Sequence, residues 1–193
     1  MVLGSSARLV VRRPRPEDEE AYLALLRASV GFHAPWFPSP PTDRDPYSSE
    51  TFRAYLAGDD GERGVRYLIV LASGTLLGAI NLNEIVRGIF QSAYLGYWLG
   101  AEHTGSGYLR EALALVMDHA FREPADGGLG LHRLEANIMP QNRASLGVVR
   151  ALGLRLEGLS LYYLKIAGSW RDHERWAILA DEWHARRAEE KQG

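Results

Sequence analysis

The segment from residue 67 to residue 99 constrains the fold most, because it predicts three strands in direct succession. Residues 67–71 and 76–82 are apolar runs joined by the short turn Ser73-Gly74, and a third run follows at about 90–99. Turns this short leave no room for a crossover helix, so neighbouring strands should be antiparallel. The third run carries apolar residues on both faces, which predicts a central place in the sheet.

Helices and further strands are expected on both sides of this segment. They are a strand at 8–13, a helix from Pro16 to about residue 30, a second helix capped by Ser48 or Ser49, a helix from Gly105, a strand at 133–138, a helix from Asn142 to Leu152 closed by Gly153, a hairpin of strands at about 155–166 and 170–180, and a short polar helix from about Asp181. This order predicts one α/β (α+β) domain over residues 8–183, with tails at 1–7 and 184–193. Its central mixed, mostly antiparallel sheet should have about seven strands, with helices on both faces.

Composition excludes several classes of function. At 193 residues and 46% hydrophobic content, the chain can bury one sizeable core. A net charge of −2 gives no reason to expect nucleic acid as a direct partner. The absence of cysteine excludes disulfides, thiolate zinc sites and a cysteine nucleophile, and the six histidines show no metal-binding spacing, so no metal is expected. Without a membrane-spanning stretch or an export signal, we expect a cytoplasmic protein with no membrane partner.

A glycine-rich turn stands between the third apolar strand and the next helix. The strand ends at Leu99-Gly100, and a short loop leads to Thr104-Gly105-Ser106-Gly107-Tyr108-Leu109. Glycines at alternate positions let backbone N–H groups face a ligand, and the helix start adds further unpaired N–H groups with a partial positive charge. This predicts a phosphate site, with simple helix capping as the alternative. The turn has neither the lysine of a Walker loop nor the third glycine of a dinucleotide fingerprint.

In its context, this turn resembles the cofactor motif Gln/Arg-x-x-Gly-x-Gly/Ala of the GNAT superfamily of N-acetyltransferases. In that family an Asn-x-x-Ser/Ala opens a later helix and Leu-Gly-Phe ends it. Here Asn142 to Ser145 and Leu152-Gly153-Leu154 stand in those places. The resemblance implies a GNAT-like fold, acetyl-CoA as cofactor, and transfer of acetyl to a primary amine by direct attack in a ternary complex.

Longer stretches resemble the ribosomal-protein-alanine/serine N-acetyltransferase (Rim) branch of that superfamily, from about residue 8 to residue 183. They are Val86–Phe90, Tyr94–Tyr97, Gly107–Leu113, Leu131–Asn137, Met139–Asn142 and Gly168–His173. This resemblance implies that the acceptor is the N-terminal α-amine of a protein such as a ribosomal protein. Thr104 and Leu109 depart from the cofactor motif, and Val149 stands where many members carry a tyrosine general acid. The role of that acid must therefore move to another group or be absent.

The resemblance also implies the contacts with the cofactor. The strand end Tyr97-Trp98-Leu99 should pair with the pantetheine arm beside a splay or bulge, with the Leu99 N–H at the thioester oxygen as a catalytic contact. Ser145 should donate to the sulfur, although an isolated serine in a first helical turn also fits capping or solvation. The full set of expected cofactor-binding residues is Tyr97, Trp98, Leu99, Thr104, Gly105, Ser106, Gly107, Tyr108, Leu109, Arg110, Asn137, Asn142 and Ser145.

The acceptor side has less specific signals. Glu84 lies just past an expected central strand and is the first choice for the base that takes the amine proton; a surface glutamate is the alternative, as are Glu135 and a water chain. Tyr163 is a possible polar partner at the cleft. Trp36 and Phe37 could wall the acceptor cleft or simply cover the helix pair.

Several readings of the function stay open at this stage. A lysine ε-amine or a small-molecule amine could replace the protein N-terminus as acceptor, since the glycine turn contacts only the cofactor. A non-catalytic acyl-CoA-binding sensor is the second class, kept open by the valine at position 149 and the uncertain base. The chain could be a monomer or a homodimer.

Overall fold

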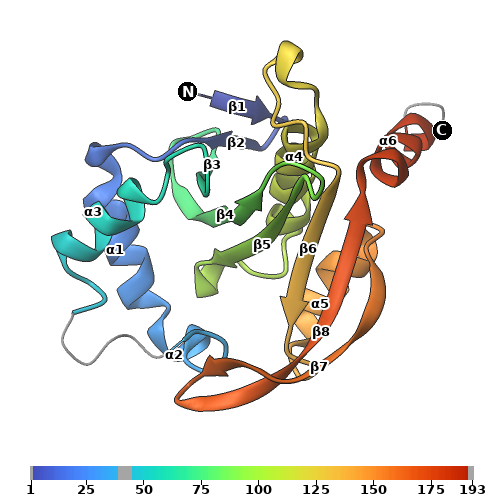
Figure 1. Ribbon diagram of the computed structural model, residues 1–193. Helices are drawn as coiled ribbons and strands as arrows, with labels where there is room; N and C mark the ends of the chain where they lie inside the picture. Colours follow the sequence, from blue (N-terminus) through green and yellow to red (C-terminus); the bar gives the residue numbers. More distant parts are fainter. Residues whose placement is uncertain (1, 39–44, 191–193) are drawn as a thin grey trace.

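The computed structural model describes residues 2–38 and 45–190 of the chain, which form a mixed α/β domain (Figure 1). Eight strands make one sheet in the order β1-β2-β3-β4-β5-β6-β8-β7. The strands are β1 (Val2–Ser5), β2 (Leu9–Arg12), β3 (Val65–Leu71), β4 (Leu76–Val86), β5 (Ser92–Leu99), β6 (Arg133–Ile138), β7 (Arg155–Ile166) and β8 (Ser169–Leu179). Neighbours are antiparallel except β5 and β6, which are parallel.

Helices cover both faces of this sheet. The α-helices are α1 (Glu19–Ala28), α2 (Val30–His33), α3 (Ser49–Ala57), α4 (Tyr108–Phe121), α5 (Arg143–Ala151) and α6 (Ala180–Glu190), and short 3-10 turns lie at Pro16–Asp18, Ala101–His103 and Pro124–Asp126. The predicted fold class is confirmed, with one strand more than the expected seven. The eighth is β1, which lies within the predicted N-terminal tail and pairs with β2 through Val2, Gly4 and Ser5.

Two hydrophobic clusters hold the layers together. The larger one joins the sheet to α4, α5 and α6, and it includes Leu99, Val149 and Trp183. The smaller one lies on the opposite face, where Tyr22 of α1 and Phe52 of α3 pack with Trp98 of β5. Successive residues of β5 therefore point to opposite faces, as the period of two requires. This alternation places the side chains of Trp98 and Leu99 in different cores.

Two predicted helix starts can be compared with the structure. The Ser48 side chain accepts a hydrogen bond from the Thr51 amide at 3.3 Å, which starts α3 and confirms the predicted cap. Helix α4 begins at Tyr108 rather than at Gly105, because Gly107 adopts a left-handed conformation (φ 78°) at the N-cap. The glycine turn is therefore a loop ahead of the helix.

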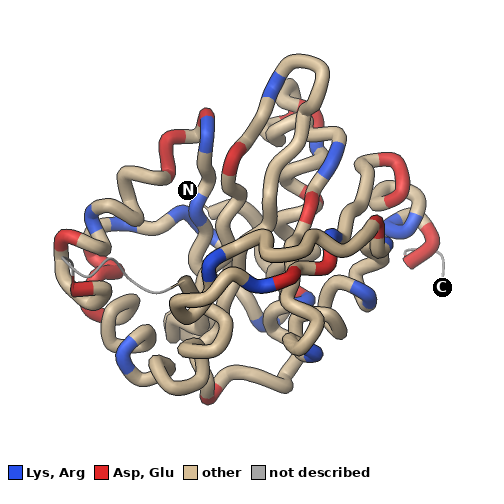
Figure 2. The backbone as a smooth tube through the Cα atoms, turned by 60° about the horizontal axis from the view of Figure 1, so that its bottom comes forward, with Lys and Arg blue, Asp and Glu red and all other residues tan. Residues whose placement is uncertain are grey.

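Charged positions are interspersed by sign along the backbone (Figure 2). Residues of both signs are spread over the molecule in this view, in keeping with the small net charge of −2. Across residues 2–38 and 45–190, no helix is long and apolar enough to cross a membrane.

Candidate active site

The sheet splits between β5 and β6. These parallel strands pair only over Ser92–Tyr94 and Arg133–Glu135. Further along, β5 pairs with β4 alone as far as Leu99, and β6 pairs with β8 as far as Ile138. The splay beside β5 that the family resemblance implies is thus present.

Beyond Tyr94, some backbone N–H groups of β5 face this gap. The Gly100 amide donates to the Leu77 carbonyl at 2.8 Å, across the end of the β4–β5 ladder. Hydrogen-bonded and non-hydrogen-bonded pairs alternate in an antiparallel ladder, so the N–H groups of Tyr97 and Leu99 face away from β4. They face the gap, which is where the resemblance places an extended ligand arm.

A cleft of about 650 Å³ passes through this gap and reaches both faces of the sheet. It brings together many residues predicted for the site, namely Trp36, Phe37, Glu84, Tyr97, Trp98, Asn137, Asn142, Ser145 and Tyr163. Leu99 is buried at the end of β5, and residues 104–110 form the loop and helix start that follow it. The predicted site residues therefore form two groups: those that line the cleft, and those of the loop and helix start that follow β5.

The glycine loop has the backbone freedom that anion binding needs. Gly105 and Gly107 have φ values of 79° and 78°, and a Cβ built on Gly105 would meet nothing within 4 Å. The Thr104 hydroxyl donates to the Ala101 carbonyl at 3.0 Å, so this side chain braces the loop. The exposed loop leads directly into the first amides of α4, a common anion site. With the Thr104 side chain bonded to the loop itself, the groups left to face an anion are backbone amides.

An arginine that the sequence analysis did not single out supports the loop. Arg8 Nη1 donates to the Ser106 carbonyl at 3.1 Å, and the guanidinium also pairs with Glu111 of α4. The same guanidinium lies 4.9 Å from the centre of the Tyr108 ring. No sequence spacing links residue 8 to residue 106, because only the fold brings β2 beside the start of α4.

Helix α5 begins at the cleft with a side-chain cap. Asn142 Oδ1 accepts a hydrogen bond from the Ser145 amide at 3.1 Å, so Asn142 is the N-cap of α5, at the predicted helix start. Ser145 supplies its amide to this cap, and the residue lines the cleft. One turn further, Val149 is buried in the larger core.

Two buried polar atoms at the cleft have no hydrogen-bond partner among the described residues: Tyr97 Oη and Asn137 Oδ1. Buried polar groups are normally satisfied, so each of these is a contact left for a ligand or water. Burial raises the pKa of Tyr97 to about 12, and Ser145 opposes that rise. A ligand with amide and thiol groups, such as the pantetheine arm, suits both atoms.

Glu84 lies inside β4, not just past the strand as the sequence predicted. The β4–β5 register shifts between Asn83 and Val86, and Glu84 at this bulge has a φ of 48°. In a regular strand, residue 84 would point to the opposite face from residue 83, but a bulge re-aims its side chain. Glu84 consequently lines the cleft together with Asn83.

Two asparagines beside Glu84 belong to the site but were not predicted. Asn83 Oδ1 accepts from Arg66 at 2.9 Å, and Asn81 Oδ1 accepts from the Tyr55 hydroxyl at 3.3 Å. Both line the cleft. The period-two spacing of Asn81 and Asn83 was the signal that could have found them.

The aromatic segment near residue 36 packs against the smaller core and also lines the cleft. Phe37 stacks on the buried His33 ring at 4.5 Å and packs against the smaller core. Phe37 and Trp36 also line the cleft. A second, apolar cavity of about 560 Å³ adjoins the cleft here and shares Phe37 and Trp98 with it.

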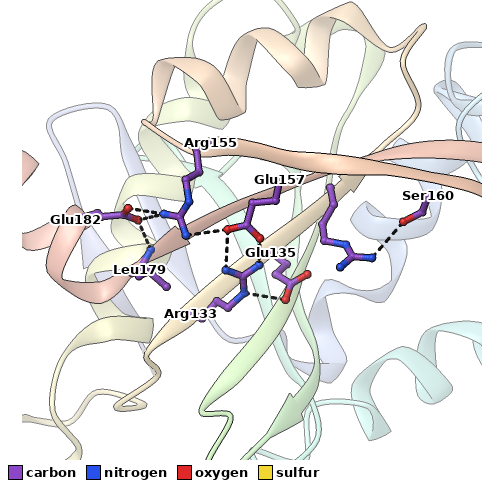
Figure 3. A network of polar contacts seen from close by, with 8 residues as sticks. Arg133, Glu135, Arg155, Glu157, Ser160, Leu179 and Glu182 are labelled. Atoms are coloured by element: carbon purple, nitrogen blue, oxygen red, sulfur yellow. Dashed lines mark hydrogen bonds and ion pairs between the residues drawn. The ribbon is translucent and has the colours of Figure 1, made fainter.

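Glu135, the alternative base, is held by an arginine (Figure 3). Arg133 Nε donates to Glu135 at 2.9 Å, and the same guanidinium pairs with Glu157. Arg155 extends this network by joining Glu157 to Glu182. Glu135 does not line the cleft in the described part of the chain. This arrangement favours Glu84 over Glu135 as the base.

The Arg133–Glu157 pair gives a prediction about acid stability. Arg133, with help from Arg155, lowers the pKa of Glu157 from 4.5 to about 2. A lowered folded-state pKa stabilises the fold above pH 4.5, and this contribution is lost as the pH falls toward 2. We expect Glu157→Gln to lower the unfolding free energy at pH 7 by at most about 1 kcal/mol, because the pair is partly exposed. The loss of stability between pH 4.5 and 2 should also become shallower.

Denaturant unfolding at pH 7, 4.5 and 3 measures both effects. Glu123→Gln removes the same charge from an exposed loop and serves as the control. If the unfolding free energies of Glu157→Gln and Glu123→Gln depend on pH in the same way as that of the unmodified chain, the Arg133–Glu157 pair does not contribute to stability.

A mixed sheet split at its centre, with a glycine loop at one helix start and a capped helix beside the gap, defines an acyl-CoA-dependent transferase. The chain belongs to the acetyltransferase (GNAT) domain family, whose model matches residues 8–155. It is an N-acetyltransferase with acetyl-CoA as its acetyl donor, which confirms the predicted enzyme class and cofactor.

The similar proteins agree on this class. The [Ribosomal protein uS5]-alanine N-acetyltransferase of Escherichia coli (strain K12) is 30% identical over 179 residues, covering 91% of this chain and 90% of that one. A protein of Bacillus subtilis (strain 168) named "Probable N-acetyltransferase YjcK" is 43% identical over 104 residues, which span 54% of this chain and only 55% of that protein. The structure of Mycobacterium smegmatis RimJ in complex with CoA-disulfide has a TM-score of 0.81 and 31% identity, covering 90% of this chain and 83% of that one.

Proposed function

We propose that the enzyme acetylates the N-terminal α-amine of a peptide or protein, such as a ribosomal protein. The observation that carries this proposal is the charge of the cleft. Glu84 is the only carboxylate among its described lining residues, and the others are aromatic, amide and apolar residues together with Ser145 and His173. One carboxylate suits an acceptor with a single amine, whereas a polyamine carries several charges to be matched. The similarity to the Escherichia coli alanine N-acetyltransferase supports the same acceptor class.

In this proposal the face of the sheet covered by α4 and α5 holds the donor. The amides of Gly105, Gly107 and the start of α4 bind the pyrophosphate. The gap-facing N–H groups of Tyr97 and Leu99 pair with the pantetheine arm, and the Leu99 N–H meets the thioester oxygen. Bound acetyl-CoA supplies an activated acetyl group whose carbonyl carbon accepts the amine.

The opposite face holds the acceptor. Glu84 takes the proton that the amine must lose, directly or through water. Asn81 and Asn83, held by Tyr55 and Arg66, present amide groups beside it. Trp36 and Tyr163 wall the approach to the gap. The leaving thiol and the attacking amine thus meet from opposite faces of one split sheet.

A panel of acceptors tests the proposal. The chain is mixed with acetyl-CoA and with a peptide bearing a free N-terminal alanine, the same peptide blocked at its N-terminus but carrying a lysine, or spermidine. Released thiol is measured directly, because the chain has no cysteine to add background. We expect kcat/KM for the free N-terminus to exceed that for the other two acceptors by at least about tenfold, a difference of about 1.4 kcal/mol in transition-state binding. A preference for the blocked lysine peptide or for spermidine would contradict it.

A further inference from the structure

Release of the thiolate is favoured by a hydrogen-bond donor near the sulfur, and the family resemblance implies a tyrosine of α5 for this role. Val149 stands at that position and is 1% exposed in the larger core. The donor must therefore be a different group near the sulfur, either Ser145 of α5 or a hydroxyl from another element.

Tyr97 is placed to supply that hydroxyl. It lies on β5, at the edge of the gap, and packs against the same core that contains Val149. Its side chain belongs to the face of the sheet covered by α5, because Trp98, the next residue, packs into the opposite core. The aromatic ring therefore lies on the face of the sheet that is proposed to hold the cofactor.

The Tyr97 hydroxyl is buried and has no hydrogen-bond partner among the described residues. A buried unsatisfied hydroxyl costs free energy, and such a group in a native fold calls for a ligand or another explanation. Ser145 of α5 is near enough to influence it, since Ser145 opposes the rise in the pKa of Tyr97 that burial causes. Ser145 is also the residue expected to contact the sulfur. Both hydroxyls therefore belong to the same part of the cleft.

We propose that the Tyr97 hydroxyl is the hydrogen-bond donor that stabilises the departing CoA thiolate, in place of the tyrosine absent from position 149. The assignment rests on the proposed acetyl transfer. In that reaction a C–N bond forms between the amine and the acetyl carbon, and the C–S bond breaks with its electron pair left on sulfur. The excess proton of the amine passes to Glu84 or to water.

Tyr97 keeps its own proton in this step. Its pKa is raised to about 12 by burial, whereas a thiol has an ordinary pKa of about 8.5, so transfer of the proton from oxygen to sulfur is uphill. A hydrogen bond from the neutral hydroxyl to the charged sulfur is favourable without that transfer. Tyr97 then acts on the leaving group from the donor face, while Glu84 acts on the amine from the other.

Titration of the thiol of bound CoA tests the assignment without turnover. Because the chain has no cysteine, thiolate absorbance in the complex comes from CoA alone. We expect Tyr97→Phe to raise the pKa of the bound thiol by about one unit, the size of one hydrogen bond to a charged group. The kcat for acetyl transfer should fall about tenfold, matching the loss of one such bond. Ser145→Ala should give a shift of the thiol pKa in the same direction.

Tyr162→Phe is the matched control, since Tyr162 is 73% exposed on β7. Tyr97→Phe removes a hydroxyl that has no partner among the described residues, so its Tm without CoA should equal or exceed that of the unmodified chain. An unchanged thiol pKa in Tyr97→Phe would overturn the assignment, even if the unmodified chain acetylates peptides. Failure of the unmodified chain to acetylate any amine would instead overturn the proposed function, and the thiol titration would still report on Tyr97.

Discussion

Replacing Gly107 with valine is expected to weaken CoA binding by about 30- to 100-fold, which corresponds to the loss of roughly one charge-assisted hydrogen bond to phosphate. Gly107 has a φ of 78° at the N-cap of α4, a conformation that a β-branched residue adopts only with strain. Crowding is not the reason, because a Cβ at this position would meet only Arg8 Nη2, at 3.8 Å. The valine should instead shift the loop and turn its amides away from the pyrophosphate.

Gly127→Val separates this effect from general backbone strain. Gly127 also has a φ of 78° and is exposed, and a Cβ at this position would meet nothing within 4 Å, but it follows the 3-10 turn at Pro124–Asp126. Both variants should lose about 1–2 kcal/mol of stability, the cost of a left-handed non-glycine residue. Titration calorimetry with CoA should find weakened binding in Gly107→Val alone. Equal affinity in the two variants would show that the loop does not hold the pyrophosphate.

The local elements of this fold were predictable because each has a short-range signal. The strand at 133–138 is bounded as predicted, and the β7–β8 hairpin turns at Ala167-Gly168, where both residues have positive φ values. The cap at Asn142 is a property of four consecutive residues and needs no tertiary information. Strand β1 was not predicted, since its four residues gain their stability from pairing with β2.

The parts of the site that depend on register were less predictable. Asn81 and Asn83 are ordinary strand residues in the sequence, and both line the cleft from β4 beside the bulge at Glu84. Tyr97 was expected at the cofactor from the resemblance, but its buried hydroxyl without a partner among the described residues follows only from the fold. Glu84 is the first choice of base from the sequence, with Glu135 as an alternative that the sequence does not exclude. The Arg133 contact with Glu135 and the bulge at Glu84 distinguish them, and both are tertiary features. The sequence pattern therefore located the cofactor loop better than the acceptor side.

The left-handed backbone at Glu84 is itself a reason to assign this residue a role. Non-glycine residues with positive φ are uncommon and strained, and they cluster at functional sites. Here the strain turns a carboxylate into the cleft beside Asn83. A glycine at this bulge would be less strained but would leave the cleft without its described carboxylate.

Glu84→Gln is therefore expected to lower kcat/KM for a peptide N-terminus by about 100-fold at pH 7, within the usual range for removal of a general base. An α-amine has a pKa of about 8, so most acceptor molecules are protonated at pH 7 and must lose that proton. At pH 9 the amine is already neutral, and the deficit should shrink by about tenfold. Measurement of kcat/KM from pH 6.5 to pH 9.5 for both enzymes gives this comparison.

Glu135→Gln is the matched control, because the same substitution is made at the carboxylate that Arg133 holds outside the cleft. We expect its kcat/KM to change by less than about threefold, because Glu135 does not line the cleft in the described part of the chain. Glutamine preserves the shape of the side chain at either position, so the Tm of each variant checks that the fold is retained. Parallel pH profiles for Glu84→Gln and the unmodified chain would remove Glu84 from the mechanism. Deprotonation would then pass through water, with the split sheet acting mainly by bringing the amine to the thioester.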